Sequence, residues 1–466
     1  MKRPFVVAAS LLSLVLIVSP LNAAGAKAGS KCSKVGITSI NAGKKFTCIK
    51  SGKKLVWNKG FAIALPKPTA TPEVAPSPSS SPAPSPTATT PAVPEILVSS
   101  ATAYRSATEC KLVNKSSDSN VNQSHDKRAW TVIDSSKTVR GLIFPVDFSD
   151  LQSPTSDVPG FKTLMDDFES YFQSQSNGKM KFTWTIAPNF TRMNKTISSY
   201  GVGSRAAGDV WKLNNDIQDL AFQTYKRESF DFIIGSAPTT TKREDIASSP
   251  AFGTNSPNYL PGTYLGGDYW SNGASSTIPT HEFGHFGFGL ADLYDYDAAM
   301  LGASGFEKQF QYMGVFDLMN WAGGAGLELT SWNRWIARII SDEQILCLPD
   351  SATTTLLKPI EEVNDNVKGL VIPISNSSAI VIENRAAKGF DSRLPKSAEG
   401  ILVYVVDTSI ASGKGPMRIV RKAGSSDNLF RDSSLKNGES LTHLGYSIKV
   451  VGAAGENLYV EVKKAS

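Results

Sequence analysis

The segment His281–His285, with the sequence HEFGH, constrains the fold more than any other part of the 466-residue chain. Two of the four histidines stand four residues apart here, and a glutamate directly follows the first. On an α-helix, residues i and i+4 lie on the same face, so a helical segment lets both imidazoles converge on one point. Thr277 and Pro279 precede the motif and are typical helix-start residues. The sequence therefore predicts a helix that carries two imidazoles and a carboxylate.

Two imidazoles on one helix face are typical ligands of zinc, which in catalytic sites keeps one position open for water. The metal lowers the pKa of that water, and Glu282 is placed to accept its proton. The alternative is an ordinary helix whose two histidines are satisfied by packing or solvent. The apolar residues around the motif indicate a buried helix. Burying its polar side chains costs free energy unless they have a bonding partner. These apolar residues are Ile278, Phe283, Phe286 and Phe288. We predict one catalytic Zn²⁺, held by His281 and His285, with Glu282 as the general base.

The first 26 residues predict export. Lys2 and Arg3 precede an apolar run over residues 5–18, and small residues at 24–26 offer a cleavage site. This pattern is typical of a secretory signal peptide, and the run is too short for a membrane span. An uncleaved signal anchor is the alternative. We expect a secreted protein, extracellular or associated with the cell wall, without a transmembrane segment.

Residues 27–65 are expected to form a small basic Cys-Cys-Trp module. Residues 25–60 contain nine lysines and no Asp or Glu, so the net charge of +6 originates here and the rest of the mature chain is mildly acidic. Short β-like runs around Cys32 and Cys48 predict a three-stranded unit with a Cys32–Cys48 disulfide, because so few residues cannot build a sufficient core unaided. The charge favours an anionic cell-wall polymer as partner, with a merely solvated surface as the alternative. We expect no nucleic-acid partner.

Composition divides the remaining chain into three parts. Residues 66–98 alternate proline with Ser, Thr and Ala, which predicts an extended linker. Helical and strand patterns interleave over residues 99–347, which predicts an α/β (α+β) catalytic domain, and residues 348–466 predict an all-β C-terminal domain. The predicted helices are 161–172 and 210–225. The predicted strands are 141–148, 180–186 and 230–234 in the first domain, and 354–357, 369–374, 379–383, 400–406, 446–451 and 457–462 in the second.

Several segments resemble the immune inhibitor A-type metalloproteases, within the metzincin-like group. HEFGHFGFGLADLYD, residues 281–295, is similar to that family's extended motif HExxHxxGxxD, and GVFDLM, residues 314–319, resembles its methionine turn beneath the metal. The resemblance implies a metzincin-like catalytic domain with an active-site helix, the activity of a zinc endopeptidase, and a supporting role for Met319. It spans residues 139–407. Further similar segments are 145–150, 176–179, 331–335, 382–385, 389–391 and 400–404.

The resemblance also implies that Asp292 is the third zinc ligand, although the spacing departs from the family pattern. In the family, the glycine stands three residues and the aspartate six residues after the second histidine. Here Gly289 stands four residues and Asp292 seven residues after His285. Gly287 and Gly289 tolerate the positive φ angles of a tight reversal, so they can absorb the extra residue. Asp295 is the alternative third ligand.

Cys110 and Cys347 flank the predicted catalytic domain. We predict a disulfide between them, as the oxidising compartment of an exported protein permits. The alternative is a cysteine that binds the zinc and holds the enzyme latent. His125 and His443 fall in unrelated segments, so we expect ordinary packing or surface roles for them. No calcium-binding loop is recognisable in the sequence, which leaves the use of calcium undecided.

These observations predict a secreted zinc endopeptidase that hydrolyses peptide bonds in protein or peptide substrates. One alternative is a cell-surface or wall-binding protein with a degenerate metal site. The other is a metal hydrolase of a cell-wall amide. The intact triplet of His281, Glu282 and His285 favours an enzyme, because an inactive descendant has no reason to keep the glutamate.

Overall fold

The computed structural model describes most of the chain. The described residues divide into two compact units, one within residues 29–62 and one within residues 97–465. The predicted signal peptide, residues 1–26, lies outside the described residues, as does the predicted linker, residues 66–98, apart from its last two residues. The described residues are 29–32, 38–41, 44–52, 54–59, 61–62, 97–116, 123–126, 133–154, 161–203, 208–242, 244–247, 250–266 and 277–465.

The N-terminal unit contains a small antiparallel sheet in which β2 is the central strand and pairs with each of the others. The predicted Cys32–Cys48 disulfide is confirmed, and it joins the segment before β1 to the middle of β2. The prediction of three strands was incomplete, because β4 is only two residues long and so has no detectable alternation. The strands are β1 (Thr38–Asn41), β2 (Lys44–Ser51), β3 (Lys54–Trp57) and β4 (Phe61–Ala62).

A six-stranded sheet forms the first part of the larger unit. Its order is β6-β5-β8-β10-β9, with β7 paired to β5 off this path. All neighbours run parallel except β9, which is antiparallel to β10 at the edge. Parallel neighbours need crossover connections, and helices α1 and α2 lie within two of them. The strands are β5 (Thr138–Asp147), β6 (Lys181–Ile186), β7 (Thr191–Arg192), β8 (Phe232–Ser236), β9 (Ala251–Phe252) and β10 (Gly262–Leu265).

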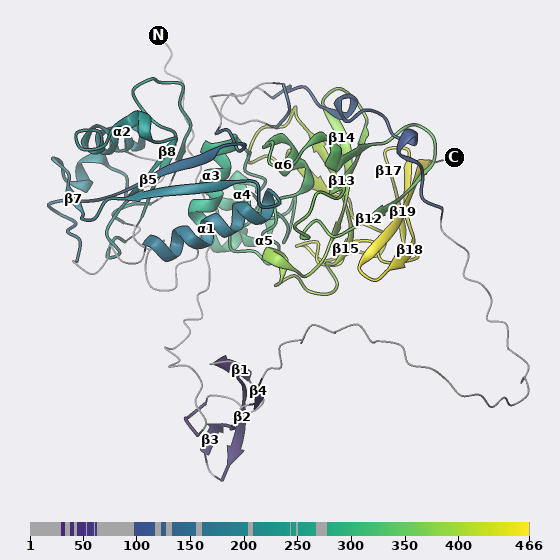
Figure 1. The fold of residues 1–466 in the computed structure, drawn as a ribbon, viewed down its shortest axis with the longest axis horizontal. Helices are drawn as coiled ribbons and strands as arrows, with labels where there is room; N and C mark the ends of the chain where they lie inside the picture. Colours follow the sequence, from purple (N-terminus) through teal and green to yellow (C-terminus); the bar gives the residue numbers. More distant parts are fainter. Residues whose placement is uncertain are drawn as a thin grey trace, which may run out of the picture. The chain divides into compact units, whose positions relative to one another are not determined.

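Side chains alternate across β5 and fill two separate cores. Val139 and Ile143 belong to a core shared with α1 and α3, whereas Leu142 and Phe144 belong to a core shared with α2. Helices α1 and α3 therefore cover one face of the sheet and α2 covers the other (Figure 1). The sequence predicted both crossover helices and placed their first residues correctly. They are α1 (Phe161–Gln175) and α2 (Val210–Ala221).

Helix α3 (Thr277–Phe288) contains the HEFGH segment, as predicted. Its phenylalanines are fully buried in an aromatic core against the sheet. The ring centroid of Phe283 lies 5.2 Å from that of Phe168 on α1 and 5.2 Å from that of Phe232 on β8. Edge-to-face rings at such distances attract each other beyond their burial. This packing fixes the helix on the sheet and so determines where its polar residues point.

Two sheets form the C-terminal part, which the sequence predicted to be built of strands. The five-stranded sheet has the order β11-β13-β14-β15-β16 and the four-stranded sheet the order β12-β19-β18-β17. Side chains from both sheets share one apolar core, so the sheets pack face to face. Short strands β11, β16 and β17 were not predicted. The strands are β11 (Ile345–Cys347), β12 (Thr353–Leu357), β13 (Gly369–Pro373), β14 (Ser378–Arg385), β15 (Gly400–Asp407), β16 (Met417–Ile419), β17 (Ser440–His443), β18 (Tyr446–Ala454) and β19 (Asn457–Lys464).

The outer face of the five-stranded sheet is also buried. Val381, Leu402 and Tyr404 point away from the second sheet and belong to the same core as α1 and α3. Helix α6 (Ser331–Ile336) packs there, with Trp332 and Trp335 almost fully buried. The sheet therefore has apolar side chains on both faces, and it links the two parts of the larger unit.

The predicted Cys110–Cys347 disulfide is confirmed and joins the 3₁₀ turn Ala107–Cys110 to β11. The chain has four cysteines, and all are paired in the two disulfides. The alternative in which a cysteine binds the zinc is therefore wrong, because neither sulfur of this pair is available as a thiolate ligand. Among the described residues, none of the helices combines the length and the apolar character that a membrane span requires.

Candidate metal centre

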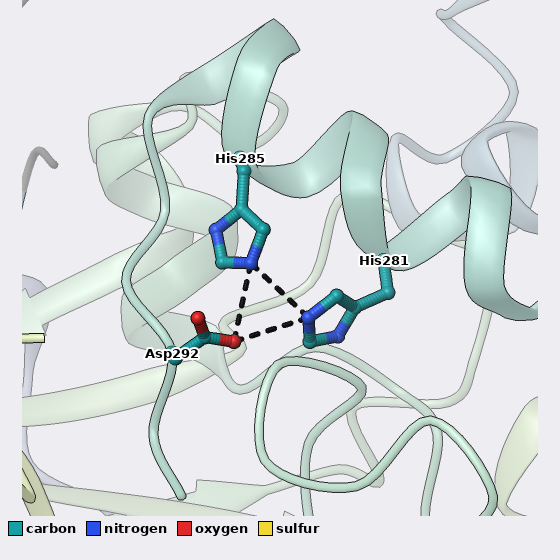
Figure 2. A group of neighbouring side chains, drawn as sticks. All are labelled: His281, His285 and Asp292. Atoms are coloured by element: carbon teal, nitrogen blue, oxygen red, sulfur yellow. Dashed lines mark hydrogen bonds and ion pairs between the residues drawn. The ribbon is translucent and has the colours of Figure 1, made fainter. Parts of the chain in front are cut away.

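Helix α3 presents His281 and His285 on one face, and the chain then reverses and returns Asp292 to the same point (Figure 2). The Nε2 atoms of the two histidines lie 3.1 Å apart, and Asp292 Oδ1 lies 3.1 Å from each of them. His281 is 7% exposed and Asp292 4% exposed. Two nitrogen atoms and one carboxylate oxygen therefore form a buried triangle with equal sides.

Hydrogen bonds on the far side of each ring determine which nitrogen faces this triangle with a lone pair. His281 Nδ1 lies 2.9 Å from the carbonyl oxygen of Leu318, and His285 Nδ1 lies 2.7 Å from that of Leu290. A carbonyl oxygen only accepts, so both Nδ1 atoms donate, and each ring in its neutral form would present an unprotonated Nε2 to the triangle. Two lone pairs and a carboxylate would then converge in one small space, which is an arrangement that can bind a cation.

The triangle has the right size for zinc. The centre of a triangle with sides of 3.1 Å lies about 1.8 Å from each corner, slightly less than the roughly 2.0–2.2 Å of zinc–nitrogen and zinc–oxygen bonds. His281, His285 and Asp292 are therefore the residues that would hold such an ion. The chemistry and the spacing of these three residues fit the ligands that zinc takes in proteins.

No known family model matches this chain, and no curated protein matches it at a significant level. The likeness to the immune inhibitor A-type metalloproteases therefore rests on the sequence motifs alone.

A single left-handed residue makes the reversal after α3. Gly289 has φ of +75°, its N–H donates to His285 O at 2.7 Å, and the N–H of Leu290 donates to Gly284 O at 3.0 Å. Gly287 remains helical, because it lies within α3, and a side chain there would collide with the ring of Phe283. The expectation that both glycines absorb the extra residue was therefore only half right. Gly289 makes the turn, and Gly287 permits packing.

The turn at residues 316–320 supports the triangle from below. Asp317 adopts φ of +72°, and its Oδ1 accepts the N–H of Met319 at 2.8 Å. In this turn the carbonyl oxygen of Leu318 accepts the hydrogen bond from His281. The carbonyl oxygen of Met319 accepts the N–H of Leu293 at 3.1 Å. Met319 is fully buried, and a Cβ atom at Gly284 would lie 2.5 Å from its sulfur. The structure thus places Met319 under α3, where it contacts the helix and holds the ligand loop.

Glu282 lies next to the ligands in the chain, but its carboxylate is not among the three atoms of the triangle. Its carboxylate accepts the N–H of Ala251 on the edge strand β9, and the residue is 6% exposed. Burial raises the pKa of Glu282 to about 8, although the charge of His281 opposes this shift. Glu282 is therefore a buried carboxyl group beside the candidate metal centre, and water solvates the charge of its carboxylate form poorly.

Electrostatic attraction within the triangle is strong. Burial alone would raise the pKa of Asp292, but the neighbouring His285 and His281 outweigh it and lower that pKa well below its ordinary value. Burial lowers the pKa of His285, and the Asp292 carboxylate reverses this effect and raises it. Both shifts have the direction expected when an ionised carboxylate lies next to an imidazolium.

Asp295, the alternative third ligand, has a different role. It caps the N-terminus of α4 (Tyr296–Ala299), and its Oδ1 accepts the N–H groups of Asp297 and Ala298. Its Oδ2 accepts hydrogen bonds from Gln311 at 2.5 Å and from Tyr312 at 3.0 Å. Both oxygens are thus used in building the loop. The structure places Asp292, and not Asp295, beside the histidines.

Asp292→Ala should lose high-affinity zinc binding, whereas Asp295→Ala should keep it. The first substitution removes one of three ligand atoms, so we expect the zinc affinity to fall by more than the roughly 10- to 100-fold typical of outer contacts. The second removes a helix cap and should lower stability by about 1 kcal/mol. Zinc content after dialysis and thermal unfolding measure the two effects. Equal zinc content in both variants would contradict the assignment of the third ligand.

Two contacts of Asp292 were not predicted from the sequence. Its Oδ2 accepts the phenol hydroxyl of Tyr296 at 2.7 Å, and its N–H donates to Ser412 Oγ at 2.9 Å. Tyr296 follows the motif closely, but tyrosine carries no metal-ligand signal. Ser412 lies 120 residues downstream, and only the tertiary fold brings it here. His125, by contrast, packs against Trp335 with ring centroids 4.1 Å apart, as expected for a residue outside the site.

Proposed function

We propose that this chain is a zinc-dependent endopeptidase of the metzincin-like type that acts outside the cell. The observation that carries the proposal is the buried triangle of His281 Nε2, His285 Nε2 and Asp292 Oδ1, with sides of 3.1 Å, next to Glu282. The motifs that resemble the immune inhibitor A-type family support the same function. The contacts of helix α3 with the segment that returns Asp292 and with the turn at residues 316–320 also support the proposal.

The side chains of this site can divide the work of hydrolysis. A zinc ion held by the triangle supplies Lewis acidity and lowers the pKa of water towards neutrality. Glu282 accepts the proton of the attacking water and can pass it to the leaving amine, as a general base and then a general acid. Leu318 and Leu290 hold the imidazoles through their carbonyl oxygens, so the ligands do not reorient during the reaction.

The edge of the six-stranded sheet supports a peptide as the substrate. Strand β9 pairs with β10 along one edge, and within the described residues no strand pairs with its other edge. An extended peptide can add to such an edge through main-chain hydrogen bonds. Because Ala251 of β9 contacts Glu282, a peptide bound there passes beside the metal centre. We therefore expect the substrate to be an extended polypeptide.

A side-by-side assay of the purified full chain tests the proposal. We expect hydrolysis of casein, loss of that activity after zinc is removed with a chelator, and recovery after zinc is added back. Purified cell-wall material should remain intact under the same conditions. Cleavage of wall amides without cleavage of casein would favour the wall hydrolase, and zinc-independent cleavage of casein would contradict the proposal. A protein that holds zinc but cleaves neither substrate would favour a binding protein.

A further inference from the structure

The loop between β15 and β16, residues 408–416, reaches the metal centre from the C-terminal sheet. Its Ser412 is 6% exposed, and Ser412 Oγ contacts both Asp292 and Tyr296. The loop thus contacts the third ligand from a part of the chain that contributes no ligand of its own. The inference drawn from this loop rests on the proposed metal site.

Both oxygens of the Asp292 carboxylate are assigned. Oδ1 belongs to the triangle (Figure 2), and Oδ2 accepts the Tyr296 hydroxyl at 2.7 Å. A carboxylate whose second oxygen is hydrogen-bonded in this way presents one oxygen to a cation, and the hydrogen bond restrains its rotation about the Cβ–Cγ bond. Tyr296 therefore determines the orientation of the ligand.

The hydroxyls of Tyr296 and Ser412 form a short chain that ends on the ligand. Tyr296 donates its single hydroxyl hydrogen to Asp292, so at the 3.1 Å contact its oxygen accepts from Ser412. Ser412 Oγ in turn accepts the N–H of Asp292 at 2.9 Å. Each hydroxyl thus donates once and accepts once. Ser412 holds the backbone of Asp292 directly, and it holds the Asp292 side chain through Tyr296. Consecutive hydrogen bonds in such a buried chain strengthen one another.

The backbone of the loop fixes this serine in place. Gly413 N–H donates to Asp292 O at 2.9 Å, and Gly413 O accepts the N–H of Tyr296 at 3.0 Å. Gly413 has φ of +70°, and a Cβ atom there would lie 2.2 Å from the ring of Tyr296. Only glycine allows this close approach between the loop and the tyrosine.

We propose that Ser412 and Tyr296 are positioning residues of the metal centre, so that the C-terminal sheet contributes to zinc affinity through the 408–416 loop. Neither residue contacts the metal position itself. Their effect is to hold Asp292 Oδ1 at the corner of the triangle when the site binds zinc.

Zinc titration of the metal-free full chain tests this inference, with zinc alone as the probe and a coloured chelator as competitor. Ser412→Ala and Tyr296→Phe should each weaken zinc binding by about 10- to 100-fold. The zinc affinity of the double variant should fall by less than the product of the two single reductions, because both side chains hold the same residue, Asp292. Ser409→Ala is the matched control, because Ser409 lies exposed in the same loop and bonds only to Asp407. It should bind zinc like the wild type.

Thermal unfolding with and without zinc separates positioning from packing. We expect the zinc-induced rise of the unfolding midpoint to shrink in Ser412→Ala and Tyr296→Phe. An equal fall of the midpoint with and without zinc, or wild-type zinc affinity in both variants, would overturn the inference. A wild-type chain that binds no zinc at all would instead contradict the proposed metal site.

Discussion

Replacing Glu282 by glutamine should reduce the hydrolysis of casein by about 10²- to 10⁴-fold and leave the zinc content unchanged. Glutamine has the same shape, and its amide oxygen can still accept the N–H of Ala251. It cannot accept a proton from water, so the general base is lost. Because the Glu282 carboxylate is not among the three ligand atoms, the triangle should still bind zinc. The measurements are the rate of casein cleavage and the metal content of the same sample.

Glu244→Gln is the matched control for this variant. Glu244 is exposed and pairs only weakly with Lys242, at 3.8 Å. Its replacement makes the same chemical change at the surface, so both activity and zinc content should stay at the wild-type values. If Glu282→Gln cleaved casein as fast as Glu244→Gln, the role of Glu282 as general base would be refuted. Loss of zinc in Glu282→Gln would mean that this carboxylate helps to hold the metal.

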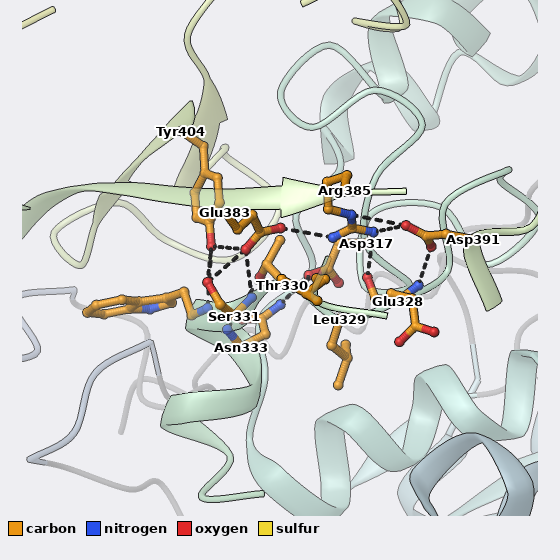
Figure 3. A network of polar contacts seen from close by, with 12 residues as sticks. Asp317, Glu328, Leu329, Thr330, Ser331, Asn333, Glu383, Arg385, Asp391 and Tyr404 are labelled. Carbon is orange, nitrogen blue, oxygen red and sulfur yellow. Dashed lines mark hydrogen bonds and ion pairs between the residues drawn. The ribbon is translucent and has the colours of Figure 1, made fainter. Parts of the chain in front are cut away.

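Replacing Arg385 by methionine should lower the free energy of unfolding by about 3–5 kcal/mol. Arg385 is almost fully buried on β14, where its guanidinium bonds to Glu383 at 2.9 Å and to Asp391 (Figure 3). It also pairs with Glu361 at 3.2 Å. Methionine fills similar space but leaves these carboxylates buried without their cation. Denaturant unfolding measures the loss. Arg431→Met, at an exposed pair with Asp427, should cost less than about 1 kcal/mol.

Glu361→Gln should have the opposite effect, and the effect should grow with pH. Burial first, and then the Asp391 charge, raise the pKa of Glu361 well above its ordinary value, although Arg385 opposes them. A raised folded-state pKa stabilises the fold below the unfolded pKa, and this contribution is lost as the pH rises through the folded value. Glutamine does not titrate.

The variant should therefore match the wild type at about pH 4 and exceed its stability at about pH 8, in denaturant unfolding at both values. Loss of stability at the higher pH would show that the Glu361 charge is needed by Arg385. In that case the two substitutions should weaken the same interaction, and their effects should not add.

The strongly periodic elements and the two histidines could be predicted from the sequence because they depend on local spacing. The i, i+4 geometry of a helix places His281 and His285 together whatever surrounds them. Likewise α1 and α2 have apolar residues at helical spacing, and their starts were predicted correctly. Both disulfides were also predicted, because Cys32 and Cys48 lie within the small basic module and Cys110 and Cys347 flank the predicted catalytic domain.

The choice between Asp292 and Asp295 could not be made from local spacing. It depends on how wide the reversal is, and the extra residue after His285 is accommodated by hydrogen bonds spanning four and six residues across Gly289. The role of Ser412 depends on contacts between segments 120 residues apart, so no local pattern reports it. Short strands such as β16 have too few residues for alternation to be detected. These features arise from tertiary packing, which overrides local preference.

The five-stranded sheet with two buried faces has a consequence for proteolytic maturation. A cut near residue 348, followed by loss of the C-terminal fragment, would expose Trp332 and Trp335 to solvent. It would also remove Ser412, which hydrogen-bonds to Asp292. A shortened form that ends at this junction would thus lose core and metal site together. Because residues 97–465 belong to one compact unit, we expect any trimming that preserves the candidate metal site to occur on the N-terminal side of that unit.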